Sequence, residues 1–221
     1  MKSIWRRLMY YGIGLSIGIL FVAIFFGGRG CSWLPEHRVK ASIFSQIIVI
    51  DTSSITKGVQ LSDSLYKTAI QSGKINFGLS ARKGEPKSYF FSFEDSKKKS
   101  LYFHVLLETD GVMSIVKHAH ELQRADTKNP NFWLPIIHVP GDSNYVSIHE
   151  DAANDFNLYQ LTRNDIHESL KKNGSAETVH IDLDSDKRKI HELKFSHNGN
   201  NFKITVRYFQ NSIQIMSISA L

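Results

Sequence analysis

The stretch LTRNDIHESLKKNG runs from Leu161 to Gly174 and predicts one of the two helices around which the chain is organised. It is typical of a capped helix that ends in glycine, the residue most favoured just past a helix C-terminus. An earlier stretch, LSDSLYKTAIQSG from Leu61 to Gly73, has the same design, with Ser62 or Asp63 as its N-cap. The sequence therefore predicts two equivalent helices, with Leu61 matching Leu161 and Gly73 matching Gly174.

Short runs rich in β-branched and aromatic residues surround both predicted helices and are typical of strands. IIVI at Ile47 to Ile50 precedes the first helix. The runs after the first helix are SYFFSF, SLYFHVLL and GVMSIVKHA, and those after the second are TVHIDL, HELKFS, FKITVRYF and SIQIMSISAL. Val105 matches Val206, and the Met-Ser-Ile triplet at Met113 matches the one at Met216. We interpret this as a diverged internal duplication, with convergence on a common pattern as the alternative.

These patterns predict an α+β protein with one N-terminal transmembrane helix followed by two similar modules. Each module is expected to have one helix and three or four antiparallel strands, with the helix covering one face of the sheet. The modules span residues 47–122 and 148–221. Residues 123–147 between them form a linker rich in proline, which disfavours regular structure. Its aromatic pair, Phe132 and Trp133, either packs between the modules or contacts a partner protein.

The predicted transmembrane helix covers Leu8 to Gly28, LMYYGIGLSIGILFVAIFFGG. This run of 21 residues contains no charge, and about 20 apolar residues suffice to cross the hydrocarbon core of a bilayer. Cleavage as a signal peptide is disfavoured, because the apolar core of such peptides is usually about 7 to 15 residues long. A tail at residues 1–7 precedes the helix, and a juxtamembrane segment at residues 29–46 follows it.

Charge on both sides of this run gives only a small orientation bias, so the short N-terminal tail decides the expected topology. We expect a single-pass protein of a bacterial inner membrane, with the tail in the cytoplasm and the C-terminal domain in the periplasm. The lipid bilayer is then one expected partner of the chain.

Small residues cluster in the first half of the same helix, at Gly12, Gly14, Ser16 and Gly18. Such spacing permits close approach of helix backbones within a membrane. It predicts packing against an integral membrane protein, although glycine is also common in membrane helices that have no partner.

The single cysteine, Cys31, excludes an internal disulfide. Lipidation of Cys31 would anchor the chain as a lipoprotein, but Gly28-Arg29-Gly30 before it fits that modification poorly. A free thiol is the favoured interpretation, and lipidation is kept as an alternative.

The stretch YYGIGLSIGILFVAIFFGGRGCSWLPEHRVK resembles the opening of a group of small gram-negative bacterial proteins of unknown function. Members of this group have glycine-containing apolar spans that continue through a cysteine, then Pro and Arg-Val. The resemblance covers roughly residues 9–120 and implies an N-terminal membrane anchor with an exterior module. It implies no activity, because the group has none assigned.

Candidate chemistry is sparse. After residue 28 the chain has 24 basic and 21 acidic residues, which gives little support to a nucleic-acid partner. His118 and His120 share one face of a predicted strand, but two ligands do not make a metal site. Asp182, Asp184 and Asp186 imitate the start of a calcium loop, yet Lys187 occupies the position that requires glycine.

No hydrolase, zinc-protease or phosphate-loop motif is present in the sequence. We therefore expect a protein that is not an enzyme and needs no cofactor: an accessory or assembly subunit of a membrane complex with a periplasmic interaction domain that binds a periplasmic protein. An anchored enzyme or metal-binding protein that uses surface histidines is the alternative, and the lipoprotein is a further one.

Overall fold

The computed structural model describes residues 2–27, 34–54, 62–95, 98–108, 111–119, 133–177, 190–209 and 212–221. The chain divides into two units, Met1–Val39 and Lys40–Leu221. The α-helices found in the described ranges are α1 (Lys2–Gly27), α2 (Pro35–Phe44), α3 (Asp63–Ser72), α4 (Glu150–Tyr159) and α5 (Arg163–Asn173).

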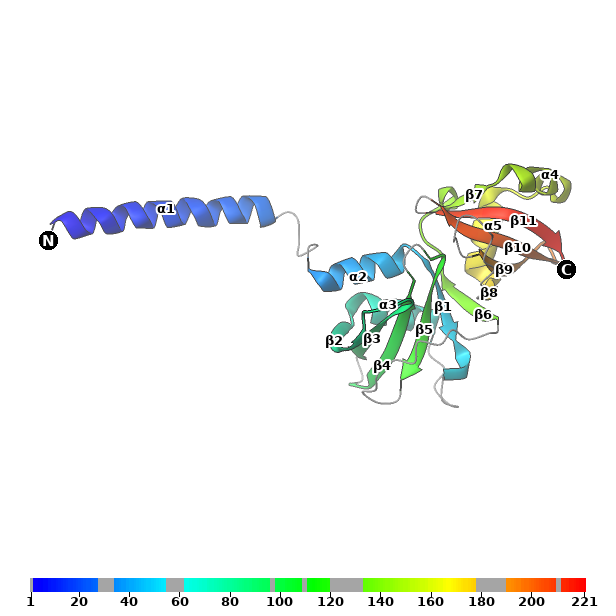
Figure 1. The fold of residues 1–221 in the computed structure, drawn as a ribbon, viewed down its shortest axis with the longest axis horizontal. Helices are drawn as coiled ribbons and strands as arrows, with labels where there is room; N and C mark the ends of the chain where they lie inside the picture. Colours follow the sequence, from blue (N-terminus) through cyan, green and yellow to red (C-terminus); the bar gives the residue numbers. More distant parts are fainter. Residues whose placement is uncertain are drawn as a thin grey trace. The chain divides into compact units, whose positions relative to one another are not determined.

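Eleven strands in these ranges form one mixed sheet, so the α+β class is confirmed (Figure 1). The strands are β1 (Ile47–Asp51), β2 (Lys74–Ala81), β3 (Lys87–Glu94), β4 (Ser100–Leu107), β5 (Met113–Ala119), β6 (Leu134–His138), β7 (Val146–Ile148), β8 (Ser175–Glu177), β9 (Ile190–His197), β10 (Asn200–Phe209) and β11 (Ser212–Ala220). Short 3-10 helices occur at η1 (Thr52–Ser54) and η2 (Ser143–Tyr145).

Strand order is the same in the two halves of the sheet. The first half runs β2-β3-β4-β5-β1 and the second runs β8-β9-β10-β11-β7. In each half the four strands after the helix form an antiparallel meander, and the strand before the helix pairs parallel with the last one. Helix α3 packs against β3, while α5 packs against β9 and α4 against β11.

Strand β6 joins the two halves. It pairs antiparallel with β1, where Ile48 lies opposite His138, and with β8, where Leu134 lies opposite Ala176. One cluster of buried apolar side chains extends from Val49 and Ile115 of the first half to Ile204 and Ile215 of the second. The region from Lys40 to Leu221 therefore has a continuous sheet and a shared core.

This architecture corrects the predicted two antiparallel modules. Each half contains a parallel pair, β1 with β5 and β7 with β11, and the second half has the additional helix α4. The physical reason is that parallel strands need a long crossover connection. In each half the helical segment and the meander together form that connection, so the last strand lies beside the strand that precedes the helix and runs in the same direction. Strand β6 then connects both halves into one sheet, although it lies in the segment expected to be a linker.

The predicted transmembrane helix is contradicted as well. Among the helices that the structure describes, none combines the length and apolar character needed to cross a membrane. Helix α1 starts before the predicted span, and its described part contains Arg6 and Arg7, which lower its mean hydropathy.

Glycine ends both repeated helices, but in a conformation other than the left-handed one expected of a glycine C-cap. Gly73 and Gly174 have extended backbones, with φ of −63° and −70°, and strands β2 and β8 begin at the next residue. A Cβ atom at Gly73 would collide with the Ala69 carbonyl oxygen, and one at Gly174 would lie 2.5 Å from the Leu170 carbonyl oxygen. Glycine is thus required at both corners because the chain turns back across its own helix.

Candidate functional site

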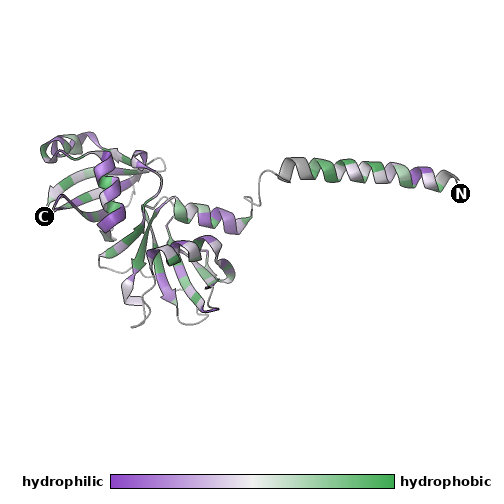
Figure 2. Ribbon diagram, turned by 180° about the vertical axis from the view of Figure 1, so that it is seen from behind, coloured by the Kyte–Doolittle hydropathy of each residue, from purple (hydrophilic) through white to green (hydrophobic). Residues whose placement is uncertain are grey.

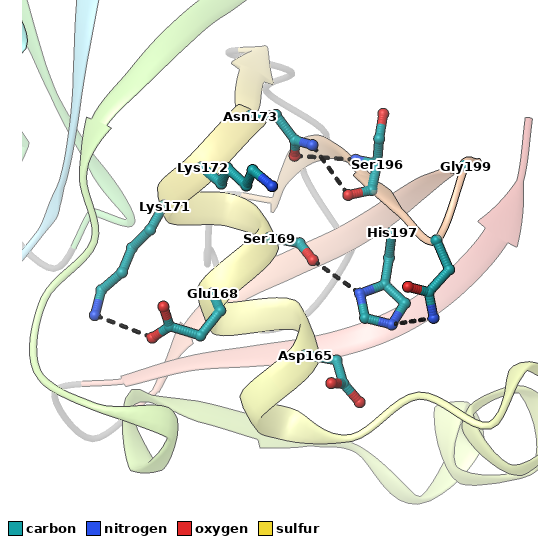
Figure 3. Close-up of a pocket in the computed structure, with 10 residues that line it drawn as sticks. Asp165, Glu168, Ser169, Lys171, Lys172, Asn173, Ser196, His197 and Gly199 are labelled. Carbon is teal, nitrogen blue, oxygen red and sulfur yellow. Dashed lines mark hydrogen bonds and ion pairs between the residues drawn. The ribbon is translucent and has the colours of Figure 1, made fainter.

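An open groove of about 590 Å³ lies between α5 and the turn that joins β9 to β10 (Figure 3). Its lining comes from α5 between Asp165 and Asn173 and from the turn between Ser196 and Gly199. All the lining side chains are polar or charged, apart from the glycine. We call this cavity the α5 groove.

A capping box fixes the start of α5. The Thr162 hydroxyl accepts a hydrogen bond from the Asp165 amide at 3.1 Å, and the Asp165 carboxylate accepts one from the Thr162 amide at 2.8 Å. These contacts satisfy donors that the first helical turn otherwise leaves open. Hydrogen bonds from the Thr162 hydroxyl and amide also lower the pKa of Asp165, which therefore carries a negative charge at neutral pH.

A tight turn forms the opposite wall of the groove. His197 pairs with Asn200 across the hairpin, and the two residues between them, Asn198 and Gly199, have φ of 50° and 81°. Positive φ at both central positions is typical of a type I′ turn, for which Asn-Gly is the preferred sequence. The turn holds His197 at the end of β9, facing α5.

Asn173 ties the end of α5 to β9. Its side-chain oxygen accepts a hydrogen bond from the Ser196 amide at 3.1 Å, and its side-chain nitrogen donates to the Ser196 carbonyl at 3.0 Å. The carboxamide thus satisfies a backbone donor and a backbone acceptor at once, as a neighbouring strand would. Both walls of the groove are therefore held in a fixed spacing.

The imidazole of His197 is hydrogen-bonded at both ring nitrogens (Figure 3). Nδ1 lies 3.2 Å from the hydroxyl of the buried Ser169, and Nε2 lies 3.0 Å from the side-chain nitrogen of Asn198. With the Asn198 amide nitrogen as the donor, Nε2 accepts, and in the neutral ring the proton then lies on Nδ1. In this tautomer the Ser169 hydroxyl accepts a hydrogen bond from His197. Activation of a serine nucleophile requires the opposite direction, because the base must take the hydroxyl proton.

Helix α5 carries side chains of opposite charge near its two ends. Asp165 lies in its first turn and Lys172 in its last, about 10 Å apart at the rise of 1.5 Å per residue. Between them Glu168 and Lys171 form an exposed ion pair at 3.3 Å. The groove therefore offers a negative group at one end of the helix and a positive group at the other.

The helix-packing residues predicted from sequence all lie in α1. Apart from the backbone of the helix itself, no described atom lies within 4 Å of where a Cβ atom would stand at Gly12, Gly14 or Gly18. The Ser16 hydroxyl donates to the Gly12 carbonyl at 2.8 Å. Cys31, the candidate lipidation site, lies outside the described residues.

Of the aromatic pair, Phe132 also lies outside the described residues, but Trp133 is placed. Trp133 is half-buried just before β6, and the Lys194 Nζ of β9 lies 3.7 Å from the centroid of its ring. The indole thus packs against the second half of the sheet.

The histidine and aspartate candidates do not form a described metal centre. His118 is half-buried in β5, and its backbone amide donates to the Ser54 hydroxyl at 2.8 Å. His120, Asp182, Asp184 and Asp186 lie outside the described part of the chain. Across the residues that are placed, no three or more His, Cys, Asp or Glu side chains gather in a way that could hold a metal ion.

Sequence reasoning missed the residues of the α5 groove. The dipeptide Asn198-Gly199 between two strand-like runs is a hairpin signal, and it places His197 at the end of a strand. The approach of Ser169 to His197 joins positions 28 residues apart, and no local pattern encodes that distance.

Comparisons with protein-family models, with curated proteins and with solved structures found no match for this chain.

Proposed function

We propose that the chain is a non-catalytic binding protein whose α5 groove receives a short polar segment of a partner protein. The observation that carries this proposal is the hydrogen bonding of His197 to both Ser169 and Asn198. An imidazole held at both nitrogens is a fixed part of the groove wall, and with the Asn198 amide nitrogen as donor its Nδ1–H points at the Ser169 hydroxyl, which is the wrong arrangement for taking up the hydroxyl proton.

The composition of the groove favours a peptide over a small apolar ligand. A volume of about 590 Å³ falls within the usual range of ligand sites, but such sites are lined mainly by apolar and aromatic side chains. The α5 groove is lined by carboxylates, ammonium groups, amides and hydroxyls. These groups match the backbone and the charged side chains of a peptide.

The charges of α5 narrow the class of peptide. Asp165 and Lys172 lie about 10 Å apart, which is the length of about three residues of extended chain. A complementary segment carries a basic group near Asp165 and an acidic group near Lys172. Charge pairing of this kind favours one orientation of the bound segment.

The test selects peptides from a random-sequence library displayed on phage, with the full chain as bait. Selected peptides are measured against Lys172→Glu and against the matched control Arg163→Glu, which changes an exposed residue of the same helix outside the groove. Reversal of Lys172 should weaken binding about tenfold or more, because a charge-assisted hydrogen bond contributes about 1.5 to 3 kcal/mol. Arg163→Glu should bind normally. Peptides that bind both variants equally well would overturn the proposal.

A further inference from the structure

A second groove, of about 470 Å³, lies in the first half of the sheet. It is lined by Ser72 to Lys74 on one side and by Ser92 to Glu94, with Ser100 and Tyr102, on the other. We call it the α3 groove. It lies between the end of α3 and the turn end of the β3–β4 hairpin, where Glu94 pairs with Ser100, as the α5 groove lies between α5 and the turn end of the β9–β10 hairpin.

The two grooves are built from equivalent parts. At each one a helix ends in a glycine with extended backbone, Gly73 or Gly174, and the following residue starts a strand. A serine near the end of the third strand of each half, Ser92 or Ser196, is hydrogen-bonded to a residue next to that glycine. Ser92 donates to the Lys74 carbonyl at 3.5 Å, and the backbone of Ser196 bonds the side chain of Asn173.

The side chains of the α3 groove differ from those of the α5 groove in one respect. Lys74 and Glu94 are exposed and supply one positive and one negative charge. Tyr102 is half-buried and adds aromatic surface, and its ring stacks on the buried Phe90 at 5.9 Å between centroids. Lys74 and Tyr102 both pair with Ser92, and Glu94 lies two residues further along β3, so these side chains share one face of the sheet. An apolar side chain can therefore pack on the Tyr102 ring while charged groups pair with Lys74 and Glu94.

We infer that the α3 groove is a second peptide-binding site, which takes a charged segment that carries an apolar or aromatic side chain, and that the chain is bivalent. This inference rests on the proposed function of the α5 groove, because the two cavities share their architecture. Both grooves lie within the one unit Lys40–Leu221. A partner with two such segments joined by a suitable linker gains affinity, since the second binding event becomes intramolecular.

The test separates the two grooves by using the full chain with Lys172→Glu as bait for a second selection from the same phage library. Peptides recovered on this bait are then measured against Lys172→Glu combined with Lys74→Glu. The matched control combines Lys172→Glu with Lys83→Glu, which alters an exposed lysine outside the groove. We expect binding to fall about tenfold or more with Lys74→Glu and to stay unchanged with Lys83→Glu.

Saturation with both peptide classes should also show two bound peptides per wild-type chain by calorimetry. The urea midpoints of all variants should be equal because the changed lysines are exposed. Equal midpoints show that a loss of binding does not come from a loss of folding. If the Lys172→Glu bait recovers no peptide, or only peptides indifferent to Lys74→Glu, the second site is refuted. The proposed function of the α5 groove stands in that case if the wild-type selection yields peptides sensitive to Lys172→Glu. Peptides sensitive only to Lys74→Glu would instead support the second site and refute the first.

Discussion

The ammonium group of Lys194 lies over the indole of Trp133, with 3.7 Å between Nζ and the ring centroid. This contact joins the residue before β6 to the middle of β9, and both side chains are half-buried. A cation over an aromatic face is attracted by the ring quadrupole, more strongly where water is partly excluded.

The first prediction concerns this pair. Lys194→Met keeps the aliphatic stem but removes the charge, and it should lower the free energy of unfolding by about 0.5 to 2 kcal/mol. Urea unfolding of Lys194→Met, Trp133→Leu and the double variant measures the coupling. If the two single effects simply add, the cation makes no specific contribution and Trp133 acts only through its apolar area.

The second prediction concerns the capping box. Thr162→Ala should lower the free energy of unfolding by about 1 kcal/mol, while Thr162→Ser should retain most of it because the hydroxyl remains. Since the pKa of Asp165 is lowered in the folded chain, the contribution of this carboxylate is present above its ordinary pKa of 3.8. It is lost as the pH falls through the folded value. Equal stability of the Ala and Ser variants would contradict the role assigned to the hydroxyl.

The third prediction concerns His138, whose pKa is lowered mainly by burial. The Phe44 carbonyl, 3.4 Å from Nε2, opposes this shift, whereas Lys67, Lys171 and His167 add to it. Because the unfolded chain binds the proton more readily, stability should be intact above pH 6.5 and should decline as the pH falls through the lower folded value. His138→Gln cannot take up this proton, so its stability should depend less on pH between 8 and 5. Urea midpoints across that range decide the matter, and parallel curves for the two proteins would exclude His138 as a source.

The fourth prediction concerns the helix-end glycines. At Gly174 a Cβ atom would lie 2.5 Å from the Leu170 carbonyl oxygen and 2.9 Å from Ile136 Cδ1, so Gly174→Ala should cost about 1 to 3 kcal/mol. The control is Gly14→Ala in α1, where no described atom outside the backbone of the helix itself lies within 4 Å of the added methyl group. Thermal unfolding should show a lower midpoint for Gly174→Ala alone, and an unchanged midpoint would mean that the corner can relax.

The fifth prediction concerns the proton of His197. Nitrogen chemical shifts and couplings of the neutral form of the labelled imidazole should show a protonated Nδ1 and an unprotonated Nε2. This tautomer follows from donation by the Asn198 amide group. The opposite tautomer would allow Nδ1 to accept the Ser169 proton, and it would remove the main argument against catalysis.

Local signals in the sequence correctly predicted the elements whose formation depends on neighbouring residues. The capping pattern around Thr162 and Asp165 marks α5, and the β-branched run at Ile47 marks β1. Helix α2 was missed although Pro35 occupies its first position, where proline is favoured. Strand β6 was missed because Pro135 lies inside it, and a proline within a run argues against a strand.

Long-range pairing could not be predicted in the same way. The parallel register of Ile47 with Met113 joins residues that are 66 positions apart, and its direction depends on how the chain crosses the sheet. The α5 groove depends on such contacts too, since Ser169 and His197 meet only after α5 has packed on β9. The predicted membrane span failed for a different reason. Helix α1 covers most of the predicted residues, but the uncharged run was considered apart from its neighbours. The helix that contains it is hydrophilic near its N-terminal end (Figure 2), and no helix that the structure describes is long and apolar enough to cross a membrane.

Strand β6 has a consequence for any shortened form of this protein. Its removal would leave β1 and β8 each with an unpaired row of backbone amides and carbonyls. Open edges of this kind recruit strands from other molecules. A fragment that stops short of Leu134 would therefore be prone to self-association through β1, so neither half of the sheet is expected to remain monomeric as an isolated domain.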